Sequence, residues 1–345
     1  MSTNLKDVLS YHKDLKKPSI TCFPRFRSLK YVKKHLTEKT QSITNLLQKG
    51  ERMQIRTISE VLKEQYGEKI YRLALESGCT CPNRDGTVGH GGCTFCSEGG
   101  SGEFASKVAP VDEQIEQAKA LVRSKTDGTH FIAYFQSFTN TYGDLNRLRE
   151  LYLETINRED IVILSLGTRP DCLGDDVIEL LKELNGIKPI WVELGLQTVH
   201  DRTAERINRC YPLSTFEDAY RRLKAAGLTV IVHLILGLPG ESEEDMLDSV
   251  RYLAALTPPP DGVKLQLLQI LRGTRMAEEF EKGLVPVMTL PEYTNLIVKA
   301  LRILPPETVI HRLTGDGPRR LLIAPEWCTD KKRVMNTLRK AIAEG

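Results

Sequence analysis

The chain has 345 residues and a hydrophobic fraction of 41%, which is enough for one large core or for two domains. Its formal net charge is only +3, so no global basic field indicates a nucleic-acid partner. No apolar run reaches the ~18 residues that a membrane-spanning helix needs, and the polar N-terminus lacks the apolar core of a secretory signal. Eight cysteines without such a signal indicate the reducing cytoplasm, where thiols are kept for metals or chemistry.

The first fifty residues differ from the rest in charge. They contain eleven Lys and Arg residues against three acidic ones, while the remainder of the chain is slightly acidic. Such asymmetry is typical of a basic arm that contacts nucleic acid, and equally of a solvated extension. We expect a basic N-terminal extension over residues 1–52.

A cysteine-rich loop follows a predicted strand at 70–75. It contains Cys79, Cys81, Cys93 and Cys96 among many Gly, Asn and Asp residues. The spacing Cys81-x11-Cys93-x2-Cys96 supplies three thiolates to an iron–sulfur cluster and leaves one iron open for a small molecule. A zinc site remains an alternative, although the Cys79-x-Cys81 spacing makes a poor second pair. A disulfide does not suit a reducing compartment.

From the cysteine loop onward, predicted strands and helices alternate. The strands are short, rich in Val, Ile and Leu, and read as apolar on both faces, which is typical of parallel strands covered by helices. Six such strands predict an α/β fold with an open, partial (β/α)6 barrel rather than the eight units of a closed one. The strands are expected at 70–75, 130–136, 161–166, 189–195, 229–237 and 262–270, and the helices at 111–123, 145–157, 177–184, 216–226 and 243–255.

The alternation breaks after residue 270. Helices are expected at 276–282, 291–303 and 331–344, and short strands at 309–313 and 321–324. We therefore divide the chain into the extension 1–52, a core domain 53–275 and a small C-terminal α/β extension 276–345. Chemistry in such folds sits at the carboxyl ends of the strands, where the polar and glycine residues of this chain cluster.

An ordered series of motifs follows these strand ends and carries a resemblance to a known family. The chain resembles radical S-adenosylmethionine (radical SAM) enzymes, in particular the radical SAM domain of Elp3, the catalytic subunit of Elongator. It is more similar still to a family of small bacterial Elp3-like proteins that lack an acetyltransferase domain. The motifs are Cys-Pro-Asn-Arg-Asp-Gly at 81–86, Phe-Gln-Ser-Phe-Thr-Asn-Thr-Tyr at 135–142, Gly-Thr-Arg-Pro-Asp at 167–171, Glu-Leu-Gly-Leu-Gln-Thr at 193–198, Arg-Ile-Asn-Arg at 206–209, His-Leu-Ile-Leu-Gly-Leu-Pro-Gly-Glu at 233–241, Thr-Gly-Asp-Gly-Pro at 314–318 and Ala-Pro-Glu-Trp at 324–327.

The chain departs from the family pattern in three places. Cys79 is surplus to the usual Cx11CxxC loop, so we do not expect it to be a ligand. Gly167 stands where Elp3 has a carboxylate, which puts a ribose contact there in doubt. Residues 1–52 have no counterpart in the small family, whose members normally begin near Met53.

The resemblance implies two cofactors. A [4Fe-4S] cluster is expected on Cys81, Cys93 and Cys96, with S-adenosylmethionine chelating the open iron. Further contacts to S-adenosylmethionine are expected from strand ends and the loops after them: Phe95 for adenine, Gln197, Arg209 and His233 for the ribose and the methionine carboxylate, and Gln136 as a further cofactor contact.

The resemblance also implies partners and a substrate. A small electron-donor protein, a flavodoxin or ferredoxin, would supply electrons. The substrate would be tRNA, whose wobble uridine would be remodelled at its C5 side chain by trimming a carboxymethylaminomethyl group to aminomethyl. The alternatives are a radical SAM enzyme acting on a small, porphyrin-like molecule, and a non-catalytic iron–sulfur or zinc binding module.

Overall fold

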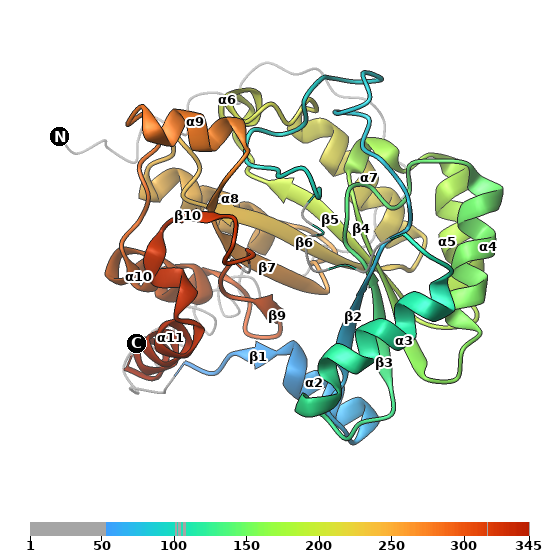
Figure 1. Cartoon of the computed structure of the whole chain (residues 1–345). Coiled ribbons are helices and arrows are strands. Elements are labelled where there is room, and N and C mark those ends of the chain that lie inside the picture. Colours follow the sequence, from blue (N-terminus) through green and yellow to red (C-terminus); the bar gives the residue numbers. More distant parts are fainter. Residues whose placement is uncertain (1–52, 101, 103–104, 106–107, 316, 345) are drawn as a thin grey trace, which may run out of the picture. The chain divides into compact units, whose positions relative to one another are not determined.

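A computed structural model describes residues 53–344 except 101, 103, 104, 106, 107 and 316. The prediction of a basic extension over residues 1–52 lies outside these residues. Eight parallel strands form the main sheet of the described chain, in the order β1-β9-β7-β6-β5-β4-β3-β2 (Figure 1). Their bounds are β1 Arg56–Thr57, β2 Tyr71–Leu75, β3 Phe131–Phe135, β4 Ile161–Thr168, β5 Ile190–Gln197, β6 Thr229–Leu236, β7 Gly262–Leu267 and β9 Val309–Arg312.

The strands at the two ends of this order, β1 and β2, are not hydrogen-bonded to each other, so the described sheet is an open part of a barrel, as predicted. Strands β2 to β7 follow the chain order and correspond to the six predicted strands. Two further strands, β9 and β1, continue the sheet beyond β7. β9 falls within the short strand predicted at 309–313, although it was not expected to join the main sheet, and the two-residue β1 was not predicted.

Helices cover the outer face of the sheet. They are α3 Val111–Val122, α4 Leu145–Ile156, α5 Asp175–Asn185, α7 Leu213–Ala225 and α8 Glu243–Ala255. Alternate strand residues such as Leu164, Leu194 and Leu234 point outward and pack with buried helix residues such as Ile115 and Phe216 in one core. At ~25 cal/mol per Å² of apolar surface, this burial supplies most of the driving force for the fold.

The inner face of the sheet is layered. At the amino ends of the strands, Ile132, Ile163, Trp191 and Ile231 form a small apolar cluster with Leu62. Leu62 belongs to α2 Ile58–Tyr66, whose start is set by a capping box between Thr57 and Glu60. One layer nearer the carboxyl ends, the inward residues are polar or charged. The prediction that the strands are apolar on both faces was therefore wrong for the middle of the inner face.

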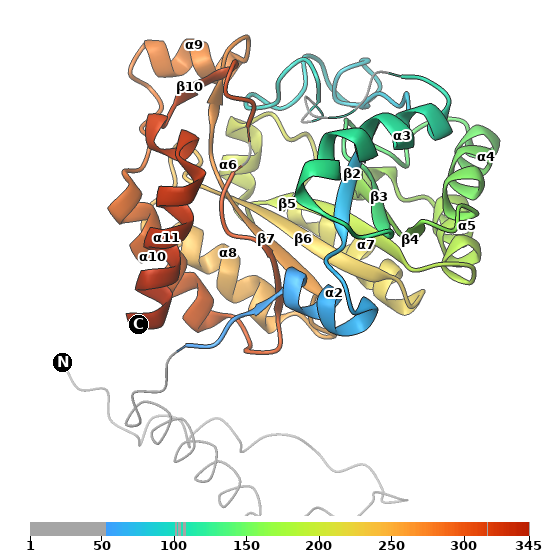
Figure 2. The same ribbon diagram turned by 60° about the horizontal axis from the view of Figure 1, so that its bottom comes forward.

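The C-terminal region contains the predicted elements. Helices α9 Arg275–Glu281, α10 Leu290–Ile303 and α11 Lys331–Glu344 lie within a few residues of their expected positions. β8 Ile270–Leu271 pairs antiparallel with β10 Leu322–Ala324. Figures 1 and 2 show α10 and α11 side by side. Because β9 joins the main sheet, part of region 276–345 extends the open barrel, and the domain boundary near residue 275 stays a prediction.

The remaining short elements are α6 Asp201–Arg206 and the 3-10 turns η1 Arg123–Lys125, η2 Pro170–Cys172 and η3 Glu326–Thr329. None of the described helices combines the length and hydrophobicity needed to cross a bilayer.

Candidate active site

A deep pocket opens at the carboxyl ends of the strands. It contains about 1400 Å³ of space free of atoms, including the part open to solvent. Its lining comes from the cysteine loop, from the inward residues of β3 to β7 and β9, and from the C-terminal region. Of the predicted site residues, Cys81, Cys93, Cys96, Phe95, Gln136, Gln197, Arg209 and His233 all line it.

The cysteine loop follows β2 and places three of its four thiols in this pocket. The Cys81 carbonyl accepts backbone hydrogen bonds from Arg84 and Asp85, and the Cys93 carbonyl accepts one from Cys96, so each thiol sits at a tight turn. Cys79 is buried elsewhere and lines a separate shallow depression. There, Nη2 of Arg147 donates to its Sγ at 3.3 Å. The surplus cysteine is thus turned away from the other three.

The three pocket thiols influence one another. Burial, followed by the neighbouring Cys96 thiolate, raises the pKa of Cys93 to about 12, against the opposing pull of the Arg169 guanidinium. Neighbouring thiolates repel one another and need a compensating positive charge, and the charge of a bound metal centre supplies it and keeps coordinating thiols deprotonated. In the described residues no three His, Cys, Asp or Glu side chains converge closely enough to ligate a single metal ion. A cluster anchors its thiolates on separate irons, so this donor set suits a cluster better than one zinc ion.

Buried polar atoms near the thiols also lack hydrogen-bond partners. Five side-chain oxygens are of this kind among the described residues, and all lie in the cysteine loop or in the loop after β3. They are Asn83 Oδ1, Thr94 Oγ1, Ser97 Oγ, Ser137 Oγ and Thr139 Oγ1. Buried polar groups are almost always paired, so this concentration marks a place where a polar ligand or cluster fits.

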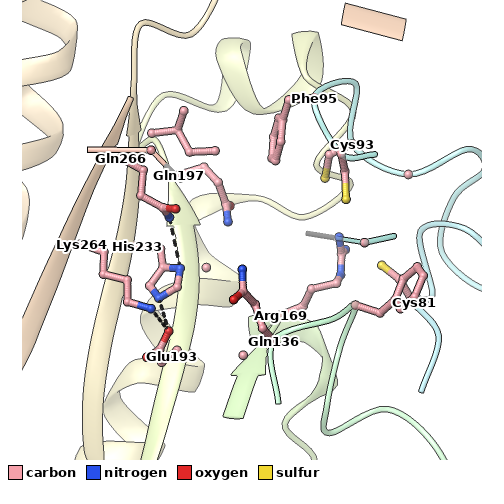
Figure 3. A pocket seen from close by; sticks show the side chains of 18 of the residues that line it. Cys81, Cys93, Phe95, Gln136, Arg169, Glu193, Gln197, His233, Lys264 and Gln266 are labelled. Atoms are coloured by element: carbon pink, nitrogen blue, oxygen red, sulfur yellow. Dashed lines mark hydrogen bonds and ion pairs between the residues drawn. The ribbon is translucent and has the colours of Figure 1, made fainter. Parts of the chain in front are cut away.

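Gln197 and Phe95 lie between the charged wall of the pocket and Cys93 (Figure 3). Gln197 ends β5 with a φ of 62°, a left-handed conformation that costs energy for a residue with a side chain. Its Oε1 and the Gly195 carbonyl oxygen each lie 2.9 Å from the Tyr211 hydroxyl. Phe95 packs on an apolar cluster that includes Leu268. Both side chains stay predicted ligand contacts, as does Gln136.

Two arginines near the thiols differ in what they can bind. Arg209 is fully buried, and its guanidinium donates to the carbonyl oxygens of Leu196, Thr198 and Tyr211 at 2.6 to 3.1 Å. These bonds shape the loop after β5, and with one N–H remaining Arg209 is poorly placed to hold a ligand carboxylate. The predicted contact from Arg209 therefore stays a prediction that this geometry does not favour.

Arg169 has donors to spare. Its guanidinium is paired with Asp171 at 2.7 and 2.9 Å and donates to the Arg209 carbonyl oxygen at 3.0 Å. Two N–H groups remain, and Figure 3 shows the side chain between Gln136 and the thiols. It is stacked on Tyr211, with the guanidinium carbon 4.8 Å from the ring centroid. The sequence placed Arg169 in a motif but did not single it out.

A buried charged network forms the pocket wall opposite the thiols (Figure 3). Glu193 Oε2 contacts Nζ of Lys264 and accepts from His233 Nε2 at 2.9 Å, while Oε1 accepts from Ser165 Oγ at 3.0 Å. Burial by itself would raise the pKa of Glu193, but the Lys264 ammonium, the His233 hydrogen bond and Arg72 outweigh it and hold this pKa well below its usual value. Glu193 is therefore ionised and paired.

His233 belongs to this network. Burial and then the Lys264 charge lower its pKa to about 4, so the ring is neutral at pH 7. Its Nε2–H donates to Glu193, and its Nδ1 accepts from Gln266 Nε2 at 3.3 Å. Both ring nitrogens are thus occupied by protein, and a contact to S-adenosylmethionine stays a prediction. The sequence missed Lys264 and Tyr134, although a lysine inside the apolar run 262–268 was a signal of a buried polar site.

Comparisons with known proteins agree with this geometry. A profile of the Radical SAM superfamily matches residues 75–253, and one of the Radical_SAM C-terminal domain matches 260–344. YtqA of Bacillus subtilis (strain 168) is 42% identical over 83% of this chain and 88% of its own length. YhcC of Escherichia coli (strain K12) is 38% identical over 78% of this chain and 86% of its own length.

More distant matches include a tRNA acetyltransferase and an archaeal Elp3. The tRNA uridine(34) acetyltransferase of Methanocaldococcus jannaschii is 28% identical over 47% of this chain and 30% of its own length. The solved structure of archaeal Elp3 from Methanocaldococcus infernus superposes with a TM-score of 0.61 at 17% identity, over 79% of this chain and 63% of that one. This chain thus spans less than two thirds of that Elp3, and the likeness concerns the fold.

Proposed function

This chain belongs to the radical SAM superfamily, and from that premise we propose that it is an enzyme that remodels the C5 side chain of the wobble uridine in tRNA. The observation that carries the proposal is the meeting of three thiols and a set of polar strand-end side chains in one pocket. Cys81, Cys93 and Cys96 would hold a [4Fe-4S] cluster, and S-adenosylmethionine would lie between that cluster and the substrate.

The chemistry that a bound cluster supplies is one-electron reduction of the sulfonium of S-adenosylmethionine, which then breaks to a hydrogen-abstracting 5′-deoxyadenosyl radical. The residues of the chain would orient S-adenosylmethionine and enclose the reacting atoms. We assign the methionine carboxylate to Arg169, since its two remaining N–H groups lie beside the thiols and a guanidinium holds carboxylates well. Gln197, held by Tyr211, and Gln136 are assigned to the ribose, and Phe95 to the adenine.

Enclosure of the pocket supports radical chemistry. Phe95 and Phe138 line one part of the pocket, and Gly315, Gly317 and Pro318 of the C-terminal region line another. These segments would keep water and competing hydrogen donors away from the reacting atoms. The reductant in the cell is proposed to be a small flavodoxin or ferredoxin.

Two features support tRNA as the substrate. The name of a distant relative, tRNA uridine(34) acetyltransferase, refers to the same nucleoside position. In this chain, exposed Arg319 and Arg320 directly follow Pro318 at the pocket, and α11 begins with exposed Lys331, Lys332 and Arg333. Basic side chains near a pocket mouth suit RNA phosphates, while a splayed-out base enters the pocket.

The test uses the full chain, reconstituted with iron and sulfide under anaerobic conditions. With dithionite it should cleave S-adenosylmethionine to 5′-deoxyadenosine and methionine, and tRNA from a strain lacking the gene should be converted at the wobble uridine. That strain should accumulate the carboxymethylaminomethyl form. A fully loaded cluster that yields no 5′-deoxyadenosine would falsify the enzyme assignment, and turnover without any change in tRNA nucleosides would point to a small-molecule substrate.

A further inference from the structure

Positive charge exceeds negative charge on the pocket wall that faces the thiols. Lys264 of β7 and Arg312 of β9 line the pocket there, and Arg72 of β2, also on the inner face of the sheet, contacts the same carboxylate of Glu193. Glu193 is the only acidic residue among the described residues that line the pocket. Its carboxylate is already bound by Lys264, His233 and Ser165, and it lies 3.7 Å from Arg72 Nη2.

Arg312 is the cation that this carboxylate does not reach. It lines the pocket, yet its guanidinium makes no hydrogen bond or ion pair with any described residue. The other pocket arginines have protein partners. Arg84 donates to the carbonyl oxygens of Cys96 and Ser97, Arg169 pairs with Asp171, and Arg209 donates to backbone carbonyl oxygens. A partly buried guanidinium without an anion is unfavourable unless a ligand supplies one.

A bulge in β9 is what aims Arg312 inward. Ile310 pairs with Val263 and points outward into the core, so regular alternation would turn Arg312 outward as well. The register shifts instead, and Arg312 pairs with Lys264 while His311 is the extra residue. His311 also faces inward, with Nδ1 3.0 Å from Arg72 Nη2 and its ring against Trp191. Bulges next to active sites commonly re-aim a side chain in this way.

We propose that Arg312, with Lys264 and the Tyr134 hydroxyl beside it, binds a carboxylate carried by the substrate. Tyr134 fits this set because its hydroxyl oxygen lies 3.2 Å from Lys264 Nζ and both residues line the pocket. A planar guanidinium binds a carboxylate through two parallel hydrogen bonds. The inference rests on the proposed function, under which the carboxylate is that of a carboxymethyl group on the C5 side chain of the uridine.

The position of this wall argues against other anions. Figure 3 shows Lys264 and Glu193 on the side of the pocket away from Cys81 and Cys93, so the carboxylate of S-adenosylmethionine, held near the thiols, does not account for it. Phosphates of an RNA backbone would stay near the exposed arginines at the mouth. A carboxylate at the wall leaves the adjoining carbon of the substrate in the middle of the pocket, between the wall and the thiols.

The experiment compares two anticodon stem-loops on the anaerobically reconstituted full chain. One carries 5-carboxymethylaminomethyluridine at the wobble position and the other its neutral carboxamide. The wild type should bind the carboxylate form about 10- to 100-fold more tightly, the range expected for a charge-assisted pair. Arg312→Gln should remove that preference and Arg312→Lys should restore part of it. Arg221→Gln, which removes an exposed arginine of α7, should behave as the wild type.

The outcomes separate the inference from the proposed function. Equal binding of both stem-loops by the wild type, binding of neither, or a preference that survives in Arg312→Gln overturns the carboxylate site. Conversion of both stem-loops with equal affinity would leave the proposed function standing while the carboxylate site falls. A preference that depends on Arg312, without any conversion, would support the site and count against the proposed function. Arg312 makes no hydrogen bonds to the described residues, so its variants should fold, which melting curves check.

Discussion

Replacing Lys264 with methionine removes the cation from a buried ion pair and leaves its partner in place. Lys264 and Glu193 are each 1% exposed, so water cannot compensate the carboxylate. Removing one member of a buried pair costs about 3 to 5 kcal/mol. We expect the lower end, because Glu193 keeps its hydrogen bonds from His233 and Ser165.

The expected change in melting temperature follows from the size of the chain. With an unfolding entropy of about 2.1 cal/mol/K per residue, roughly 290 structured residues give ~0.6 kcal/mol/K, so a loss of about 3 kcal/mol lowers Tm by ~5 °C. The matched control is Lys182→Met, which breaks an exposed pair with Glu179 at 2.8 Å. Such surface pairs contribute about 0 to 1 kcal/mol, so the control should lose less than ~2 °C.

The loss of stability in Lys264→Met should also depend on pH. In the wild type the pKa of Glu193 is lowered, so its contribution to stability is present above the unfolded pKa of the carboxyl and lost as pH falls through the folded value. Without Lys264, the largest of the effects that lower the pKa of Glu193 is lost, so this pKa rises and the cost of keeping the carboxylate ionised grows with pH. His233 loses a nearby cation as well and can protonate more easily at low pH.

Differential scanning calorimetry at pH 5.5 and pH 8 checks this reasoning. The gap in Tm between wild type and Lys264→Met should be larger at pH 8, and the double variant Lys264→Met/Glu193→Gln should recover part of it. A gap that is the same at both values, or no larger than that of Lys182→Met, would refute the buried ion pair. A double variant less stable than the single one would do the same.

Three further predictions concern the cluster, the ligand contacts and the N-terminus. Alanine at Cys81, Cys93 or Cys96 should abolish iron binding and the broad absorbance of an iron–sulfur cluster. Cys79→Ala should retain both, because the Cys79 thiol contacts Arg147 outside the pocket. The opposite pattern for Cys79 and Cys81 would reverse the assignment. Gly195→Ala would place a methyl group 2.4 Å from Gln197 Nε2 and push that side chain aside, so KM for S-adenosylmethionine should rise severalfold while Tm stays nearly constant; an unchanged KM would exclude Gln197 from the ligand site. A chain that starts at Met53 should still hold iron and cleave S-adenosylmethionine. If residues 1–52 bind RNA, their removal should flatten the salt dependence of RNA binding by about one unit of slope for each phosphate that is no longer neutralised. Failure of this truncated chain to fold would place the domain boundary elsewhere.

Local sequence signals predicted the thiol loop and most of the secondary structure of this chain, although they missed β1, α2 and α6. Helices α8 and α11 occupy the residues predicted for them, and the cysteine spacing names the three thiols that the pocket brings together. These features depend on periodicity, capping and short-range spacing, which neighbouring residues in the chain determine by themselves. The motifs after each strand likewise indicate the pocket, because parallel strands bring their carboxyl ends to one edge.

Other features were decided only by the tertiary structure. Arg209 and Arg169 both lie near a strand end. Only the packed loop shows that Arg209 donates most of its N–H groups to carbonyl oxygens, whereas Arg169 pairs with Asp171 and keeps two N–H groups for a ligand. Lys264 and Glu193 lie 71 residues apart, and nothing in either strand names its partner. Arg312 faces the pocket through a one-residue slip in β9, and such a slip reverses which face a side chain takes. Pairings and registers of this kind depend on contacts between distant segments, so they exist only once the sheet has assembled.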